Sequence, residues 1–280
     1  MWRSQLFVLL GVDRLSLQYQ SAFFSRHQSA QMTISFEATP ENLWQSAVQQ
    51  LDAALTELKQ VGQADLNLVL SSEFVRYLIL PPQGIAANAV ESKAYAQAFF
   101  NDIYGDTAQT WQIAVDDTAP HMPSLAVAIE GAFYKQLNLI VDKHHLTLKR
   151  FEPFVTTAVN LLDKEIGNTS GYLAIVELHR VLLLRLRKGK LMHLKVDVIR
   201  NYWQQTLTQL VMRKDALNLD EFCTDSTQET INEVVLLFTP FISGGFNGKV
   251  GELEIKSVGL QRNAQSNQFL AMLQTTNSVV

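Results

Sequence analysis

The stretch that decides the fold is Val8-Leu9-Leu10-Gly11-Val12-Asp13-Arg14-Leu15-Ser16-Leu17, because the second half of the chain repeats it. The counterpart is Leu173-Ala174-Ile175-Val176-Glu177-Leu178-His179-Arg180-Val181-Leu182-Leu183. In each copy an apolar run typical of a buried strand is followed by an acid and then by an arginine that opens a second strand. Similar stretches far apart in one chain indicate an internal repeat.

The elements that follow each copy also correspond. Each copy is followed by a third strand and by a helix that carries Trp-Gln near its start, at Trp44-Gln45 and Trp203-Gln204. Four and seven residues beyond each tryptophan stand apolar residues, a spacing that places them on one helix face: Val48, Leu51, Leu207 and Leu210. Each helix leads toward an apolar strand, at 66–70 and 234–238. Both halves therefore have the order strand-strand-strand-helix-strand.

This order predicts an α/β protein of two lobes, residues 1–165 and 166–280. Between the two units lies additional sequence, which we interpret as a small subdomain inserted into the first lobe at about residues 81–150. We expect a helix over 199–214 in the second lobe and a closing helix over 267–273.

Composition limits the class of protein. The chain has 280 residues, of which 47% are hydrophobic and 18% charged, so a packed core is expected and disorder is excluded. The net charge is −4 with no basic stripe along the sequence, which argues against nucleic acid as a partner. The single cysteine, Cys223, excludes an internal disulfide and fits a reducing compartment. The apolar run from Leu6 to Val12 is too short to span a membrane, and we expect no membrane-crossing segment.

A duplicated unit of this order resembles the actin-like, ribonuclease H-like fold, in which two lobes face each other across a nucleotide-binding cleft. In the nucleotide-binding relatives the first hairpins read roughly Asp-x-Gly, and the glycine lets the backbone approach a phosphate. Neither Asp13 nor Glu177 is followed by such a glycine, and Thr239-Pro240 stand where the relatives have Gly-Gly at a third turn. A Gly244-Gly245 pair a few residues later could form a shifted turn. We therefore interpret Asp13, Glu177, Thr239 and Pro240 as degenerate loop positions and expect no cofactor.

Local motifs extend the resemblance to one family within this fold. Phe74-Val75-Arg76-Tyr77-Leu78-Ile79-Leu80-Pro81 is similar to a family strand that ends in Leu-Pro, and Pro153, Asn160, Leu191 to Val196 and Phe269 to Leu273 also match. The family is that of the actin-like assembly proteins of type IV pili and type II secretion systems, which includes PilM, MshI and the cytoplasmic domain of GspL.

The resemblance implies a non-catalytic cytoplasmic scaffold at the inner face of a bacterial inner membrane. In the pilus proteins an extended cytoplasmic segment of a PilN-like inner-membrane partner lies between the first lobe and its inserted subdomain. In this chain that groove would be bounded by the strand Val75 to Leu80 and by elements of residues 111–150. The expected partner-binding residues are Phe74, Tyr77, Leu78 and Leu80, although core packing is the expected role of at least half of them.

Other interpretations remain open. One is an actin-like ATP-binding protein, an ATPase or a sugar-kinase-like enzyme, with degenerate loops; another is a free-standing dimeric adaptor, and the scaffold itself could form a homodimer. A nuclease-like metal site would need Asp13 together with Asp116-Asp117 and Glu177, which lie in different parts of the predicted fold, so we expect no metal site and no catalytic residues. The basic cluster Arg185, Arg187, Lys188 and Lys190 is typical of a solvated hairpin, but such an edge also suits acidic lipid head groups or an acidic partner.

Overall fold

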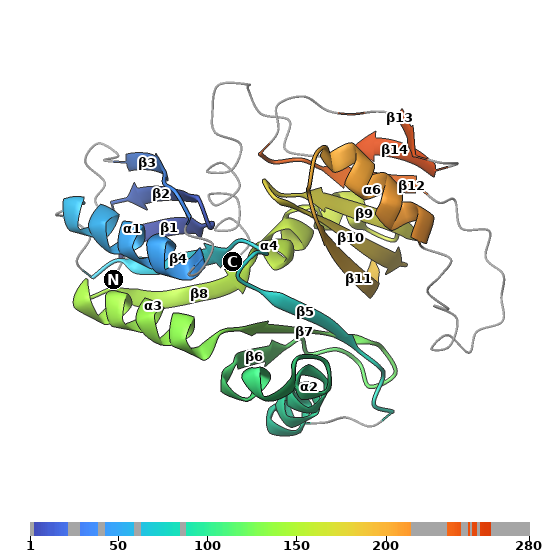
Figure 1. The fold of residues 1–280 in the computed structure, drawn as a ribbon, viewed down its shortest axis with the longest axis horizontal. Helices are drawn as coiled ribbons and strands as arrows, with labels where there is room; N and C mark the ends of the chain where they lie inside the picture. Colours follow the sequence, from blue (N-terminus) through green and yellow to red (C-terminus); the bar gives the residue numbers. More distant parts are fainter. Residues whose placement is uncertain are drawn as a thin grey trace.

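The computed structural model describes residues 3–21, 29–38, 43–58, 63–84, 88–213, 234–241, 246, 248–250 and 253–258. The closing helix expected over 267–273, the Gly244-Gly245 pair and Cys223 lie outside these residues. The described residues form three sheets (Figure 1). No helix in these ranges is long and apolar enough to cross a membrane.

The first lobe is built on a five-stranded sheet of order β3-β2-β1-β4-β8. β1 pairs antiparallel with β2 and parallel with β4, and β8 continues the parallel part. The helices α1 (Leu43–Glu57) and α3 (Gly131–Lys143) cover one face and enclose a core with it. The strands are β1 (Gln5–Leu10), β2 (Arg14–Gln20), β3 (Ser29–Ser35), β4 (Asp65–Leu70) and β8 (Thr147–Pro153).

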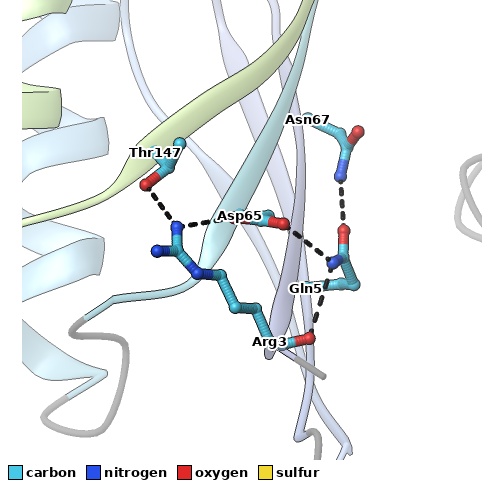
Figure 2. Close-up of polar contacts among 5 residues, drawn as sticks. All are labelled: Arg3, Gln5, Asp65, Asn67 and Thr147. Atoms are coloured by element: carbon cyan, nitrogen blue, oxygen red, sulfur yellow. Dashed lines mark hydrogen bonds and ion pairs between the residues drawn. The ribbon is translucent and has the colours of Figure 1, made fainter. Parts of the chain in front are cut away.

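A polar network joins the starts of the three parallel strands of this sheet (Figure 2). Nη1 of Arg3 donates to Oγ1 of Thr147 at 3.0 Å and lies 3.4 Å from Oδ1 of Asp65. Nε2 of Gln5 reaches Oδ2 of Asp65 at 3.5 Å, and Nδ2 of Asn67 donates to Oε1 of Gln5 at 3.2 Å. Because each polar group has a partner from a neighbouring strand, the network fixes the register at this end of the sheet.

The second lobe is built on a six-stranded sheet of order β11-β10-β9-β12-β14-β13. The helix α6 (Trp203–Met212) lies across one face (Figure 1). It begins later than the predicted residue 199, because the amide of Ile199 donates to the carbonyl of His179 at 2.8 Å and continues the pairing of the preceding hairpin. The strands are β9 (Gly171–Val176), β10 (Arg180–Arg187), β11 (Lys190–Val198), β12 (Val234–Phe238), β13 (Gly248–Val250) and β14 (Leu253–Ser257).

The predicted duplication is confirmed by the order of elements. The series β1-β2-β3-α1-β4 of the first lobe recurs as β9-β10-β11-α6-β12, and the strand order within the two sheets is the same. Trp44 and Trp203 both lie in the first turn of the equivalent helices α1 and α6. The apolar residues four and seven positions beyond each tryptophan are buried against the sheets, as predicted: Val48, Leu51, Leu207 and Leu210.

The residue-by-residue alignment of the repeat needs a correction. The amide of Gly11 donates to the carbonyl of Arg14, and the amide of Glu177 donates to the carbonyl of Arg180, both at 2.8 Å. The two arginines are therefore equivalent, whereas the two acids are not: Glu177 occupies the position of Gly11, and His179 that of Asp13. The sequence comparison paired the acids because each stands between a strand and an arginine, but β9 ends directly before Glu177 and β1 ends three residues before Asp13.

The inserted subdomain is a three-stranded antiparallel sheet of order β5-β7-β6, covered on one face by α2. Its strands span Arg76 to Ile129, so the small sheet begins and ends earlier than the predicted 81–150. α3 and β8 belong with the first lobe, because β8 pairs with β4 and α3 packs in the core of that lobe. The elements are β5 (Arg76–Leu80), α2 (Ala89–Tyr104), a 3-10 turn η1 (Gly105–Thr110), β6 (Gln112–Val115) and β7 (Ser124–Ile129).

The two lobes share a hydrophobic core around α4 (Phe154–Leu161), which is followed by the short α5 (Asp163–Ile166). Phe154, Val155 and Ala158 of α4 pack in one buried cluster with Phe7 of the first sheet and Ile175 of the second. α4 therefore lies between the two sheets, as Figure 1 also shows. Because α4 is buried against both sheets, apolar contacts join the two lobes in addition to the chain that connects them.

Candidate functional site

The candidate site lies where the lobes meet, at the ends of three strands. The turn after β1 contains Asp13, the turn after β9 contains Glu177 and His179, and the segment after β4 begins with Ser71 and Ser72. The first two turns correspond to those that hold phosphates in nucleotide-binding members of the fold that this chain resembles. Side chains of these segments contact one another across the junction.

Glu177 of the second lobe is held by two donors of the first lobe. Its Oε2 accepts a hydrogen bond from Oγ of Ser71 at 2.7 Å and another from the backbone amide of Ser72 at 3.0 Å. Only 3% of Glu177 is exposed, and its Oε1 has no hydrogen-bond partner among the described residues. A protein carboxylate thus takes up the hydroxyl and amide donors at this junction, which are groups of the kind that bind an anion.

Burial dominates the electrostatics of this junction. Desolvation raises the pKa of Glu177 above its usual value, although the hydrogen bonds from Ser72 and Ser71 act in the opposite direction. Desolvation also raises the pKa of the neighbouring Glu73. The hydroxyls of Ser72 and Tyr77 are 2.8 Å apart and share a hydrogen bond, and burial raises the pKa of Tyr77 well above its usual value.

A second, more exposed contact joins the same two turns. Nε2 of His179 lies 2.9 Å from Oδ2 of Asp13, with 46% and 35% of the two side chains exposed. Because solvent screens a contact between side chains that are this exposed, the His179–Asp13 contact orients the turns more than it stabilises the lobes. Asp13, which was considered as a metal ligand, is engaged by a histidine, and no group of three potential ligands that could hold a metal ion occurs among the described residues.

Two of the predicted loop positions, Thr239 and Pro240, lie at the end of a strand of the second sheet. Thr239 and Pro240 directly follow β12, and Pro240 is buried. Proline has no amide hydrogen, so Pro240 cannot donate a backbone hydrogen bond to a ligand. The sequence prediction missed Ser71 and Ser72, because it was based on glycine. The available signal was a Ser-Ser pair directly after the strand predicted at 66–70.

The four residues predicted to bind a partner occupy different environments. Phe74 is buried in the core of the first lobe, with its ring centroid 4.9 Å from that of Phe133, and Leu80 is buried in the core of the inserted subdomain. Leu78 is partly exposed, and so is Tyr77, although the hydroxyl of Tyr77 lies in buried surroundings beside Ser72. Phe74 and Leu80 therefore support the structure around β5, and only Tyr77 and Leu78 retain surface that a partner can reach; their partner-binding role stays a prediction.

Comparisons with known proteins give the fold. No protein-family model matches the sequence, and no curated protein matches it either. The cytoplasmic domain of EpsL, an inner membrane component of the type II secretion system of Vibrio cholerae, is similar with a TM-score of 0.53 and 12% identity, over 98% of this chain and 94% of that chain. A Bacteroides thetaiotaomicron protein with an actin-like ATPase fold and unknown function is similar with a TM-score of 0.60 and 12% identity, over 97% and 96%.

A type IV pilus biogenesis complex of PilM and PilN is matched with a TM-score of 0.47 and 12% identity, over 77% of this chain and 66% of that one. The two likenesses above 0.5 extend over nearly the whole of each chain and agree with the duplicated sheets described above. This chain therefore has the two-lobed actin-like ATPase fold, the fold of the cytoplasmic domain of EpsL.

Proposed function

We propose that this chain is a non-catalytic cytoplasmic scaffold of a type IV pilus, MSHA-like or type II secretion-like assembly. In this role it binds the cytoplasmic segment of an inner-membrane, PilN-like partner, and it lies at the inner face of the membrane through that partner. The observation that carries the proposal is the hydrogen-bonded position of Glu177, because its carboxylate takes up donors at the junction where relatives of this fold bind a polyphosphate. The likeness to a cytoplasmic domain from a secretion system supports the choice of assembly.

The position of Glu177 at this junction favours a scaffold over an enzyme. A polyphosphate at this junction would have to displace the buried carboxylate of Glu177 and would lie near Glu73, a second carboxyl that is partly buried. Like charges in a buried site repel strongly. A protein partner needs no phosphate donors, so the same fold can be kept for binding alone.

The partner segment is expected at β5. This strand is an edge of the three-stranded sheet, and it lies close to β11 of the second lobe. An extended peptide can bind at such a place through backbone hydrogen bonds and side-chain pockets. Tyr77 and Leu78 are the predicted contacts that keep exposed surface.

Peptide binding tests this proposal. The probes are synthetic peptides that cover the cytoplasmic segments of inner-membrane proteins encoded beside this chain, and binding to the full chain is measured by fluorescence anisotropy. One peptide is expected to bind, and Leu78→Asp is expected to weaken that binding at least about tenfold, because a charge replaces an apolar contact.

Leu139→Asp is the matched control, since Leu139 of α3 is 51% exposed and lies outside the inserted subdomain. Thermal unfolding of both variants identifies any loss of fold, to which Leu78 is susceptible through its packing against the core under α2. If no neighbouring peptide binds, or if Leu78→Asp binds as well as Leu139→Asp, the scaffold or its binding place is wrong, and the dimeric adaptor becomes the better interpretation.

A further inference from the structure

The basic residues of this acidic protein are concentrated in one part of the second lobe. Residues 180–213 contain eight of the 23 lysines and arginines and one of the 27 acidic residues, a formal charge of +7 in a chain whose total is −4. This stretch comprises β10, β11 and α6. A charge asymmetry of this size indicates a surface with its own partner.

The hairpin places several of these cations on one side of the sheet. Arg185 lies opposite His193 and Arg187 opposite Lys190, while Lys195 lies opposite Leu183, which is buried with α6. Directly opposed residues of antiparallel strands share a face, as do residues two apart on one strand. Between Arg185 and Leu186 the register shifts by one residue of β11. Arg187 and Lys190 therefore lie on the same face as Arg185 and His193. These cations therefore lie on the face of the sheet that α6 partly covers.

We call Arg185, Arg187, Lys190, Lys195 and Arg213 the basic face. Arg213, at the end of α6, is close enough to Lys195 to lower its pKa, a shift to which burial contributes most. Burial, Lys195 and Arg185 likewise lower the pKa of His193. None of the five residues is ion-paired to an acid in the part of the chain that the structure describes. The cations of the basic face therefore repel one another, which an external anionic surface would relieve.

Exposed apolar side chains accompany the basic face. Met212 precedes Arg213 and is 66% exposed, and Tyr202, before the start of α6, is 73% exposed. Cations mixed with exposed apolar and aromatic side chains are typical of proteins that lie on a lipid surface, where the charges meet head groups and the apolar groups enter the interface. A purely acidic peptide or a nucleic acid would leave these apolar groups without a function.

We propose that the basic face docks on an anionic phospholipid membrane, with Met212 entering the head-group region. This contact goes beyond the proposed scaffold function, because it needs no protein partner.

Co-sedimentation with vesicles tests the proposal with the full chain alone. Vesicles of phosphatidylcholine are compared with vesicles in which about one third of the lipid is phosphatidylglycerol, at low salt and at about 0.5 M salt. Binding is expected to the anionic vesicles at low salt only. The combined variant Arg187→Gln, Lys190→Gln and Lys195→Gln is expected to bind about 100-fold more weakly, since each cation near the surface contributes about fivefold.

The matched control is Lys93→Gln, Lys135→Gln and Lys149→Gln, which removes the same charge from exposed positions in α2, α3 and β8. It is expected to bind like the wild type. Met212→Ser, which leaves the charge unchanged, is expected to weaken binding severalfold. The proposal is wrong if the wild type does not bind anionic vesicles, if the two triple variants bind equally, or if the basic face binds polyglutamate but not vesicles, which would make its partner an acidic protein.

Discussion

Glu177 is a buried carboxylate that links the two lobes, and its environment determines how stability depends on pH. Two donors of the first lobe, Oγ of Ser71 and the amide of Ser72, hold one of its oxygens, while the other oxygen has no partner among the described residues. Desolvation raises its pKa above the usual 4.5, so the folded protein binds this proton more tightly than the unfolded chain does.

Glu177→Gln is expected to change the pH dependence of the unfolding free energy. In the wild type the contribution of Glu177 is complete below about pH 4.5 and decreases as the pH rises through the raised pKa of the folded state. The amide of the variant does not titrate. The unfolding free energy of the wild type minus that of the variant is therefore expected to fall with rising pH, by about 1.4 kcal/mol for each pH unit between the two pKa values.

Urea unfolding between about pH 4 and about pH 8 measures this difference. Glu177→Ala is the companion variant: it leaves the donors of Ser71 and Ser72 unpaired and should cost about 1–3 kcal/mol at neutral pH. Because the charge of Glu177 also raises the pKa of Glu73, the comparison is repeated in a Glu73→Gln background, where that coupling is absent. A difference between wild type and Glu177→Gln that stays constant across this range would show that the carboxyl is not desolvated in the folded protein.

The hairpin of β10 and β11 is the element that carries the basic face, and its turn is fixed by one glycine. Lys188 and Gly189 both have positive φ, at 48° and 73°. The amide of Gly189 donates to the carbonyl of Thr169 at 2.9 Å, and a Cβ on Gly189 would come within 1.9 Å of the carbonyl oxygen of Gly167. The turn therefore packs directly on the backbone of the segment that precedes β9.

Gly189→Ala is expected to destabilise the protein more than Gly84→Ala does. Both glycines have positive φ, at 73° and 74°, which costs alanine about 1 kcal/mol, but a Cβ on Gly84 would meet no atom within 4 Å. The extra cost at position 189 comes from the clash with Gly167 and is expected to be about 1–3 kcal/mol. Thermal unfolding of the two variants measures it, and equal losses of stability would contradict the close packing of this turn.

The elements themselves were predictable from the sequence, but their alignment and some of their boundaries were not. Strand and helix order followed from hydrophobic periodicity, so the repeat was found without knowledge of contacts. The equivalence of Glu177 with Gly11 depends on one hydrogen bond in each turn, which leaves no mark in the sequence. β5 was taken for the last strand before the insertion because an apolar run does not reveal which strand it pairs with; in the structure it pairs with β7. For the same reason the sequence did not show that Phe74 and Leu80 are buried.

At the scale of the whole molecule, the lobes are joined in two different ways. The cluster around α4 packs apolar residues of both sheets together, and the contact of Glu177 with Ser71 and Ser72 adds polar bonds between the lobes. A hydroxyl and an amide, donors of the kind that bind anions, thus hold the lobes together through Glu177. In this arrangement the two lobes are held together without a nucleotide between them. We expect this of a scaffold rather than of an ATPase.

Mg-ATP is therefore expected to leave the thermal stability of the full chain unchanged. A ligand present at a thousand times its dissociation constant stabilises the folded state by about 4 kcal/mol, so a site of micromolar affinity would raise the midpoint by several degrees at millimolar nucleotide. In this chain the polyphosphate would meet the carboxylate of Glu177, which already accepts hydrogen bonds from Ser71 and Ser72. Differential scanning fluorimetry with Mg-ATP, and with magnesium alone as the control, measures the shift. A rise with Mg-ATP beyond the control would mean that the junction opens to nucleotide, and the ATP-binding interpretation would replace the scaffold.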